Sequence, residues 1–363
     1  MNYRYFVPVE VYGGKDCVRA HADVFARYGR NALIVTGKSS EKNGALSDVC
    51  AALEENGQSY GIFDAIPSNP TVACVVEGAE RARAMNAQLV VAIGGGSPMD
   101  AAKAIAMLAR QRVDGDIFAH AIGEDVLPMI HIPTTAGTGS EVTEYAILTN
   151  EAKQTKTSIS APSLFPKVAL LDGKYMEGLP QSVTVNTALD AISHAVEGML
   201  SVRAGVLSDA LARESLRLLL GEYPALLKGE YSADARQTLL EGATLAGMVI
   251  ANTGTTPVHG MGYSLTYFHG VPHGRANGLL LPAFLKACEE KIPGRMAQIC
   301  DALGMQTDRF SEMVASLLGK RERFTDEKLR DYASRAAKNK NVQNCLARFT
   351  EGDLYKVLCT AFA

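Results

Sequence analysis

The hydrophobic pattern of the first half alternates between short apolar runs and longer amphipathic segments. The runs 32–36, 60–66 and 89–93 are short and apolar, whereas 45–56 and 71–85 place apolar residues three and four positions apart. Short runs rich in Val and Ile are typical of buried strands, and the longer spacing is typical of helices. Because strands that alternate with helices of this length form βαβ units, the first half predicts a mostly parallel sheet covered by helices.

The pattern changes after Asp172, where only helical spacing of Leu, Val and Met continues. We therefore predict an α/β Rossmann-like parallel-sheet domain over residues 1–178 and an all-α domain over residues 179–363. The clearest helical segments of the second domain are 184–200, 206–221, 235–250 and 258–268.

Two glycine-rich turns follow apolar strands of the first domain. The first turn spans 94–98, in which Ser97 suits a helix N-cap, Pro98 the first helical position, and Asp100 the first turn. Gly94 and its neighbours would let a ligand approach the backbone, and the free N–H groups of a helix start bind anions. The second turn spans 133–141 and is rich in hydroxyl groups. Each could be a simple turn, but two at the carboxyl ends of strands indicate a dinucleotide site.

The strand at 32–36 indicates which dinucleotide is bound. NAD-selective sites usually place an acid at the end of the second strand, where it accepts a hydrogen bond from the ribose 2′-hydroxyl. Here Gly37 stands at that position, and Ser39, Ser40 and two lysines follow. We therefore predict that NADP(H) is favoured over NAD(H), with NAD(H) as the alternative.

One helix of the second domain carries an acid and a histidine four residues apart, Asp190 and His194. This spacing places both side chains on one helix face. A buried Asp is rare unless it is paired or coordinated, so the alternatives are an Asp–His hydrogen bond and a metal site. Together with His259 and either His269 or His273, the pair could bind a divalent cation with a position open for substrate.

Composition narrows the class of protein. The 363 residues are 47% hydrophobic and 21% charged with a net charge of −3, which favours a globular protein without a nucleic-acid partner. No apolar run approaches the roughly 20 residues of a membrane span, and the first residues lack a signal-peptide pattern. The seven cysteines contain no CxxC motif. These features predict a cytoplasmic protein without a membrane partner.

Four motifs resemble the iron-dependent (group III) alcohol dehydrogenase family, which has the dehydroquinate synthase-like fold. They are GGGSPMDAAKA, PTTAGTGSEVT, the Asp190–His194 spacing and the segment from His259 to His273, and the resemblance covers nearly the whole chain. It implies that Asp190, His194, His259 and His273 bind the metal, usually Fe²⁺ and sometimes Zn²⁺. The residues that it implies at the dinucleotide are Asn69, Gly95, Gly96, Ser97, Thr134, Thr135, Thr138, Ser140 and Lys156.

The resemblance also implies reversible hydride transfer between NAD(P)(H) and a small primary alcohol or its aldehyde, in a homodimer or larger homo-oligomer. Two positions depart from the family pattern. Tyr263 stands where many members carry a proton-relay histidine, and Gly37 stands where many carry an acid. Tyr263 and His269 are the candidates for passing a proton, although each could instead be a wall residue.

Three other functions remain open at this stage. The first is glycerol dehydrogenase-like oxidation of a polyol. The second is a sugar-phosphate cyclase, which would need several basic residues near the metal, whereas only Arg275 adjoins the histidine motifs. The third is a nucleotide-binding protein without catalytic activity.

Overall fold

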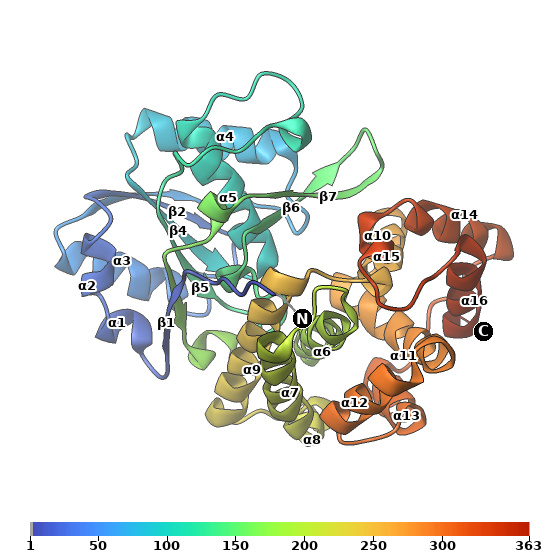
Figure 1. Cartoon of the computed structure of the whole chain (residues 1–363). Coiled ribbons are helices and arrows are strands. Elements are labelled where there is room, and N and C mark those ends of the chain that lie inside the picture. Colours follow the sequence, from blue (N-terminus) through green and yellow to red (C-terminus); the bar gives the residue numbers. More distant parts are fainter. Residues whose placement is uncertain (1–2, 363) are drawn as a thin grey trace. The chain divides into compact units, whose positions relative to one another are not determined.

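The alternating segments of the first half form a six-stranded sheet in the computed structural model, which describes residues 3–362 (Figure 1). The strand order is β1-β8-β5-β4-β2-β3, and every neighbouring pair is parallel. The predicted strands at 32–36, 60–66 and 89–93 are confirmed within a few residues. The six strands are β1 (Glu10–Gly13), β2 (Asn31–Thr36), β3 (Ser59–Phe63), β4 (Leu89–Gly94), β5 (Met129–Pro133) and β8 (Val168–Leu171).

Helices cover both faces of this sheet because its central strands are apolar on both sides. Leu33 and Val35 of β2 pack with α4 and α5, while Ala32 and Ile34 pack with α1, α2 and α3. A separate antiparallel hairpin, which the sequence pattern did not predict, is formed by β6 (Tyr145–Asn150) and β7 (Thr155–Ser160). The helices are α1 (Cys17–Ala20), α2 (Asp23–Ala26), α3 (Ala45–Glu55), α4 (Val72–Ala84) and α5 (Gly96–Arg110). Short 3₁₀ turns lie at Ile117–Ala119, Ser140–Val142, Pro162–Leu164 and Gly173–Met176.

The strand order creates a switch point between β2 and β4. The chain leaves β2 for β3 on one side and returns to β4 on the other side. Thr36 of β2 pairs with Ile93 of β4, so Gly37 and Gly94 lie at the same edge of the sheet. Open α/β sheets bind ligands at such a point, outside the carboxyl ends of the strands.

Beyond Leu171 the described chain contains helices but no further strand. The central helix of this part is α6, whose residues from Ala188 to Leu200 are all buried, and it packs against α7 and α11. A helix that is apolar on nearly every side is stable only when other helices surround it. The helices are α6 (Gln181–Leu200), α7 (Val206–Gly221), α8 (Tyr223–Lys228), α9 (Ala233–Thr253), α10 (Pro257–His269), α11 (His273–Lys291), α12 (Pro293–Leu303), α13 (Thr307–Leu318), α14 (Asp326–Ala337), α15 (Lys340–Gln343) and α16 (Glu351–Phe362).

The chain divides into two compact units. One contains Val7–Leu179 together with Tyr231–Glu241, and the other contains the remaining described residues. The segment Tyr231–Glu241 includes the first turns of α9, and its Gln237 side chain accepts a hydrogen bond from the Gly173 amide at 2.8 Å. This long-range pairing explains why the sheet unit contains a segment that lies far along the sequence. Across residues 3–362, no helix is both long and apolar enough to cross a membrane.

Candidate metal centre and dinucleotide site

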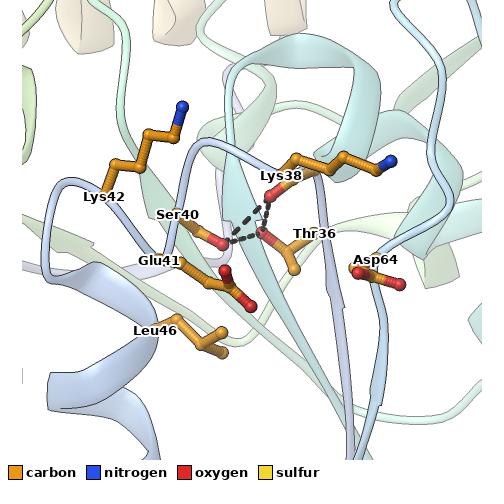
Figure 2. A pocket seen from close by; sticks show the side chains of 8 residues that line it. Thr36, Lys38, Ser40, Glu41, Lys42, Leu46 and Asp64 are labelled. Carbon is orange, nitrogen blue, oxygen red and sulfur yellow. Dashed lines mark hydrogen bonds between the residues drawn. The ribbon is translucent and has the colours of Figure 1, made fainter.

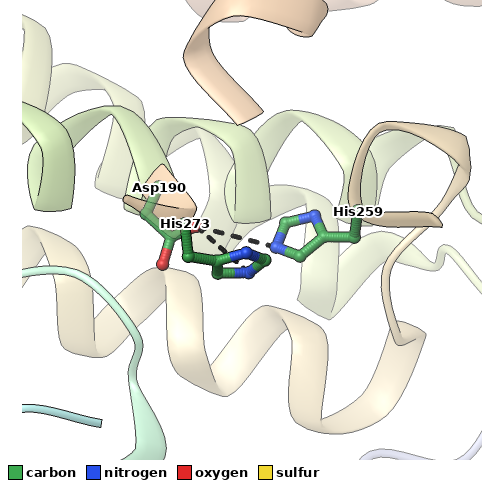
Figure 3. Close-up of side chains that lie close together, drawn as sticks. All are labelled: Asp190, His259 and His273. Carbon is green, nitrogen blue, oxygen red and sulfur yellow. Dashed lines mark ion pairs between the residues drawn. The ribbon is translucent and has the colours of Figure 1, made fainter. Parts of the chain in front are cut away.

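Four predicted metal ligands lie on three helices of the helical unit. Asp190 and His194 lie one turn apart on α6, His259 lies in the first turn of α10, and His273 begins α11. The Oδ1 atom of Asp190 lies 4.0 Å from Nε2 of His194, 3.7 Å from Nε2 of His259 and 3.9 Å from Nε2 of His273. Figure 3 shows the imidazoles of His259 and His273 turned toward the Asp190 carboxylate. The structure therefore brings these four side chains together.

The spacing of these atoms fits a small divalent cation. Bonds of 2.0–2.2 Å in a tetrahedral site place neighbouring ligand atoms about 3.4 Å apart. The ligand atoms of Asp190, His259 and His273 all lie within 4.8 Å of one another, so movements on the order of 1 Å would bring them to this spacing. Nε2 of His194 lies 4.0 Å from the Asp190 oxygen of this group. One carboxylate with three imidazoles suits Fe²⁺ or Zn²⁺ better than Mg²⁺ or Ca²⁺, which prefer oxygen ligands.

Hydrogen bonding and charge prepare Asp190 for this role. Burial by itself would raise the pKa of its carboxyl. The opposite effect of His194, His273, His259 and the amide of Asn277 is larger, so the pKa is lowered to about 2. Asp190 is consequently ionised at neutral pH, as a metal ligand must be. The Asn277 Nδ2 atom donates to Asp190 Oδ1 at 2.8 Å.

Two residues of this site, Glu197 and Asn277, were missed by the sequence reasoning. Glu197 is fully buried and contacts His259 through its carboxylate, and Asn277 contacts Asp190 from α11. A signal for Glu197 was present in the sequence. Asp190, His194 and Glu197 follow one another at helical spacing, so one stripe of an otherwise apolar helix is polar.

The two candidates for proton transfer lie in different surroundings. The ring of Tyr263 stacks on that of His273, with centroids 5.7 Å apart. His269 ends α10, where its Nε2 lies 2.5 Å from the hydroxyl of Tyr332 and its ring contacts Phe324. Tyr263 therefore lies beside His273, one of the four predicted ligands. His269 instead links α10 to α14 and to the segment that precedes α14.

The two predicted glycine-rich turns lie against each other in the sheet unit. A Cβ atom added to Gly95 would lie 3.0 Å from Thr135 Oγ1, and one added to Gly96 would lie 2.8 Å from Thr138 Cγ2. The Thr134 amide donates to the Gly94 carbonyl at 2.9 Å, which joins the ends of β4 and β5. Side chains at these glycines would fill the space between the turns.

The start of α5 differs from the prediction. Ser97 was expected to be the N-cap and Pro98 the first helical residue, but α5 begins at Gly96 and its N-cap is Gly95. The N-cap prediction is therefore wrong. The Ser97 hydroxyl instead donates to the carbonyl of Ser68, next to Asn69. The physical reason is the contact between α5 and the segment after β3. Local preferences for residues at helix starts cannot predict such a long-range contact.

Asp100 and Ser140, predicted near the cofactor, bond to each other inside the unit. The Ser140 hydroxyl donates to Asp100 Oδ1 at 2.6 Å, and Asp100 Oδ2 accepts from the Ile147 amide at 3.2 Å. The fully buried Lys103 donates to Ser140 Oγ at 2.8 Å and to the Tyr145 carbonyl at 2.8 Å. These hydrogen bonds connect the second glycine-rich turn to α5. Helix α5 itself begins in the first glycine-rich turn.

We expect Lys103→Met to lower the free energy of unfolding by about 3 kcal/mol at pH 7, because it removes the counter-charge of the half-buried Asp100 and the donor to Tyr145. Burial lowers the pKa of Lys103 to about 8, below its value of 10.5 in the unfolded chain. Between about pH 8 and pH 10.5 the unfolded chain therefore binds more protons than the folded protein does, so the free energy of unfolding of the wild type rises with pH over this range. Urea denaturation from pH 7 to 10.5 should show the difference between wild type and variant widening.

Lys286→Met, at an exposed lysine paired with Asp308, provides the control for this measurement. Its stability should stay within about 0.5 kcal/mol of the wild type. A Lys103→Met variant as stable as this control would contradict the expected role of Lys103.

A pocket of about 280 Å³ lies beside Gly37 in the sheet unit. Figure 2 shows the side chains of Lys38 and Lys42 with those of Glu41 and Asp64 around it. Asp64 follows β3 and was not predicted to lie here. The other lining residues are Thr36, Ser40 and Leu46.

The remaining predicted dinucleotide residues differ in exposure and partners. Ser40 is buried and its hydroxyl donates to the Gly37 carbonyl at 3.1 Å, whereas Ser39 is exposed. The Asn69 carbonyl accepts from Thr149 Oγ1 at 3.4 Å, and Thr149 pairs with Lys156 across the hairpin. Asn69 and Lys156 thus both lie next to Thr149.

Comparison with known families agrees with this architecture over both halves of the chain. The sequence model described as iron-containing alcohol dehydrogenase matches residues 8–173, and the C-terminal model of the same family matches residues 184–362. The chain belongs to the iron-containing alcohol dehydrogenase family. This membership makes it an oxidoreductase of the alcohol and aldehyde class.

Several known proteins are similar to this chain over most of their length. Lactaldehyde reductase of Escherichia coli K12 is 32% identical over 303 residues, which cover 82% of this chain and 79% of that protein. An iron-containing alcohol dehydrogenase from Thermotoga maritima superimposes with a TM-score of 0.91 at 35% identity, with 99% of each chain covered. Sulfoacetaldehyde reductase from Bifidobacterium kashiwanohense, solved in complex with NAD⁺, gives a TM-score of 0.90 at 28% identity, with 100% of this chain and 99% of that chain covered.

Proposed function

We propose that this dehydrogenase interconverts a small primary alcohol and its aldehyde, using a divalent metal ion and NADP(H). The observation that carries the proposal is the convergence of Asp190 with three imidazoles on α6, α10 and α11. The name of the similar lactaldehyde reductase supports a short aldehyde as the substrate. We favour Fe²⁺, with Zn²⁺ as the second choice.

The residues have separate tasks in this proposal. Asp190, His194, His259 and His273 would hold the cation, which when bound polarises the oxygen of the alcohol or aldehyde. The backbone of the two glycine-rich turns would bind the phosphates of the dinucleotide, which carries the hydride. We favour Tyr263 over His269 for passing a proton, because Tyr263 stacks on a ligand whereas His269 is bonded to Tyr332.

The surroundings of Arg275 argue against the cyclase alternative. Its guanidinium pairs with the Glu322 carboxylate at 2.6 Å and donates to the Leu318 carbonyl at 2.9 Å. An arginine held by an acid and by backbone oxygens has little capacity left for a substrate phosphate. Oxidation of a polyol would use the same metal and cofactor residues, so activity measurements must separate it from oxidation of a primary alcohol.

The test is a panel of aldehydes, alcohols and polyols with NADPH and NADH, run on protein loaded with Fe²⁺ or Zn²⁺ and on metal-free protein. We expect metal-dependent oxidation of NADPH with a short aldehyde and the reverse reaction with the matching alcohol. Turnover only with polyols would replace the proposed substrate class. No net change in NADPH with any substrate would contradict the proposal.

Gly37 provides a separate test of cofactor preference. The nearest atom to an added Cβ, the carbonyl oxygen of Ile66, is 3.9 Å away, so a side chain can start there without a clash. We expect Gly37→Asp to lower kcat/KM for NADPH relative to NADH by roughly 10- to 100-fold, since a new carboxylate beside Glu41 and Asp64 repels a 2′-phosphate. Steady-state kinetics with both cofactors measures this ratio.

Gly178→Asp, at an exposed glycine of the same unit, adds the same charge away from the pocket and should leave the ratio unchanged. Wild-type protein with a clear preference for NADH would overturn the NADP(H) assignment. The metal and substrate assignments would stand in that case.

A further inference from the structure

Glu197 is a fully buried acid that lies outside the proposed ligand set. It lies on α6, one turn beyond His194, and both of its oxygens accept hydrogen bonds from the start of α10. Oε1 accepts from the Thr256 amide at 2.8 Å, the Thr256 hydroxyl at 2.8 Å and the His259 amide at 3.4 Å. Oε2 contacts Nδ1 of the His259 ring. Both oxygens of this buried carboxylate therefore have partners at the start of α10.

The bond from Oε2 determines which nitrogen of His259 can bind a metal. An ionised carboxylate only accepts hydrogen bonds, so the proton of the imidazole must lie on Nδ1. In the neutral ring the lone pair is then on Nε2, the nitrogen that lies 3.7 Å from Asp190 Oδ1. A metal ligand must present an unprotonated nitrogen, and a carboxylate on the opposite nitrogen both selects and orients it.

The bonds to Oε1 fix the helix that carries the ligand. The first amides of a helix lack partners within the helix, and a negative charge near them is favourable. Glu197 supplies that charge from α6, the helix that also carries Asp190 and His194. The same side chain thus sets the ring orientation of His259 and the position of α10 relative to two other ligands.

We propose that Glu197 is a positioning residue that tunes the metal affinity of the site through His259. This inference rests on the proposed metal centre. Replacing Glu197 with Gln preserves the shape of the side chain but converts one acceptor oxygen into an NH₂ donor. The amide cannot accept at both α10 and His259 Nδ1, so either the cap or the orientation of His259 is lost.

The experiment measures the dissociation constants of Zn²⁺ and Fe²⁺ by competition with a chelator. We expect Glu197→Gln to weaken binding about 10- to 100-fold, as removal of carboxylate partners of metal-binding histidines does elsewhere. Glu289→Gln is the matched control. Glu289 is also an acid that accepts from a helix start, at 2.6 Å, but the donor is the hydroxyl of Thr307 and not a histidine ring. Its metal affinity should equal that of the wild type.

A second measurement separates positioning from general loss of structure. In ¹⁵N-histidine NMR spectra of metal-free protein, His259 should carry its proton on Nδ1 in wild type and lose that preference in Glu197→Gln. A lower melting temperature with unchanged metal affinity and an unchanged His259 spectrum would overturn the inference. Wild-type protein that binds neither metal would instead contradict the proposed metal centre.

Discussion

Replacing Asp190 with Asn is expected to lower kcat/KM for aldehyde reduction by on the order of 1,000-fold, which corresponds to about 4 kcal/mol of transition-state stabilisation. Asp190 supplies the only negative charge among the four predicted ligands, and its pKa of about 2 keeps that charge at neutral pH. A neutral amide keeps the shape of the side chain but leaves the cation with imidazoles alone. Metal analysis after dialysis, together with steady-state kinetics, should show both the ion and the activity lost.

Asp301→Asn removes a charge of the same kind from the helical unit without touching the ligand cluster. Asp301 is exposed and pairs with Arg213, so its metal content and kcat/KM should match the wild type. An Asp190→Asn protein that keeps full metal content and activity would show that the cluster is a structural Asp–His pairing.

Gly274→Ala is expected to lower the free energy of unfolding by about 3 kcal/mol and to weaken metal binding at the same time. Gly274 follows His273 in the first turn of α11, where this helix contacts α6. An added Cβ would overlap the carbonyl oxygen of Asn186 and lie 2.9 Å from Asp190 Cβ. Backbone atoms cannot rotate away as a side chain can, so α11 must move and carry His273 away from Asp190.

Gly294→Ala is the matched control for this prediction. Gly294 lies in the first turn of α12, where an added Cβ meets open space among the described residues. Alanine there should be neutral or stabilising by up to about 1 kcal/mol, because it favours the helix. Urea denaturation and chelator competition on both variants test the idea. If Gly274→Ala had the stability and metal affinity of the wild type, α11 could move away from α6 without a loss of free energy, which would contradict the prediction.

The two predictions rest on different properties of the same helix pair. Asp190 acts through its charge, whereas Gly274 acts through the closeness that its missing side chain allows. Gly278, one turn later on α11, would place an added Cβ 2.9 Å from Leu189 Cδ1, so the close approach continues along α6. The close approach of α11 to α6 thus depends on small residues beside Asp190, an acid of the proposed metal centre.

Features that depend on neighbours along the chain were determined by the sequence itself. The alternation of apolar strands and amphipathic helices predicts the parallel sheet, because strand and helix periods are local properties of the backbone. The Asp190–His194 spacing places both groups on one helix face for the same reason. The glycines at 94–96 allow the turn at the end of β4, where Gly94 has a φ of 148°.

Features that depend on long-range packing were decided only by the tertiary structure. Spacing alone left His269 and His273 equal, and the packing of α11 against α6 brings His273 to Asp190. Ser97 turns to the Ser68 carbonyl, Asp64 enters the pocket beside Gly37, and Glu197 reaches His259 across 62 positions of sequence. Each of these contacts joins segments that no local pattern relates, since the packing of separate elements determines which groups meet.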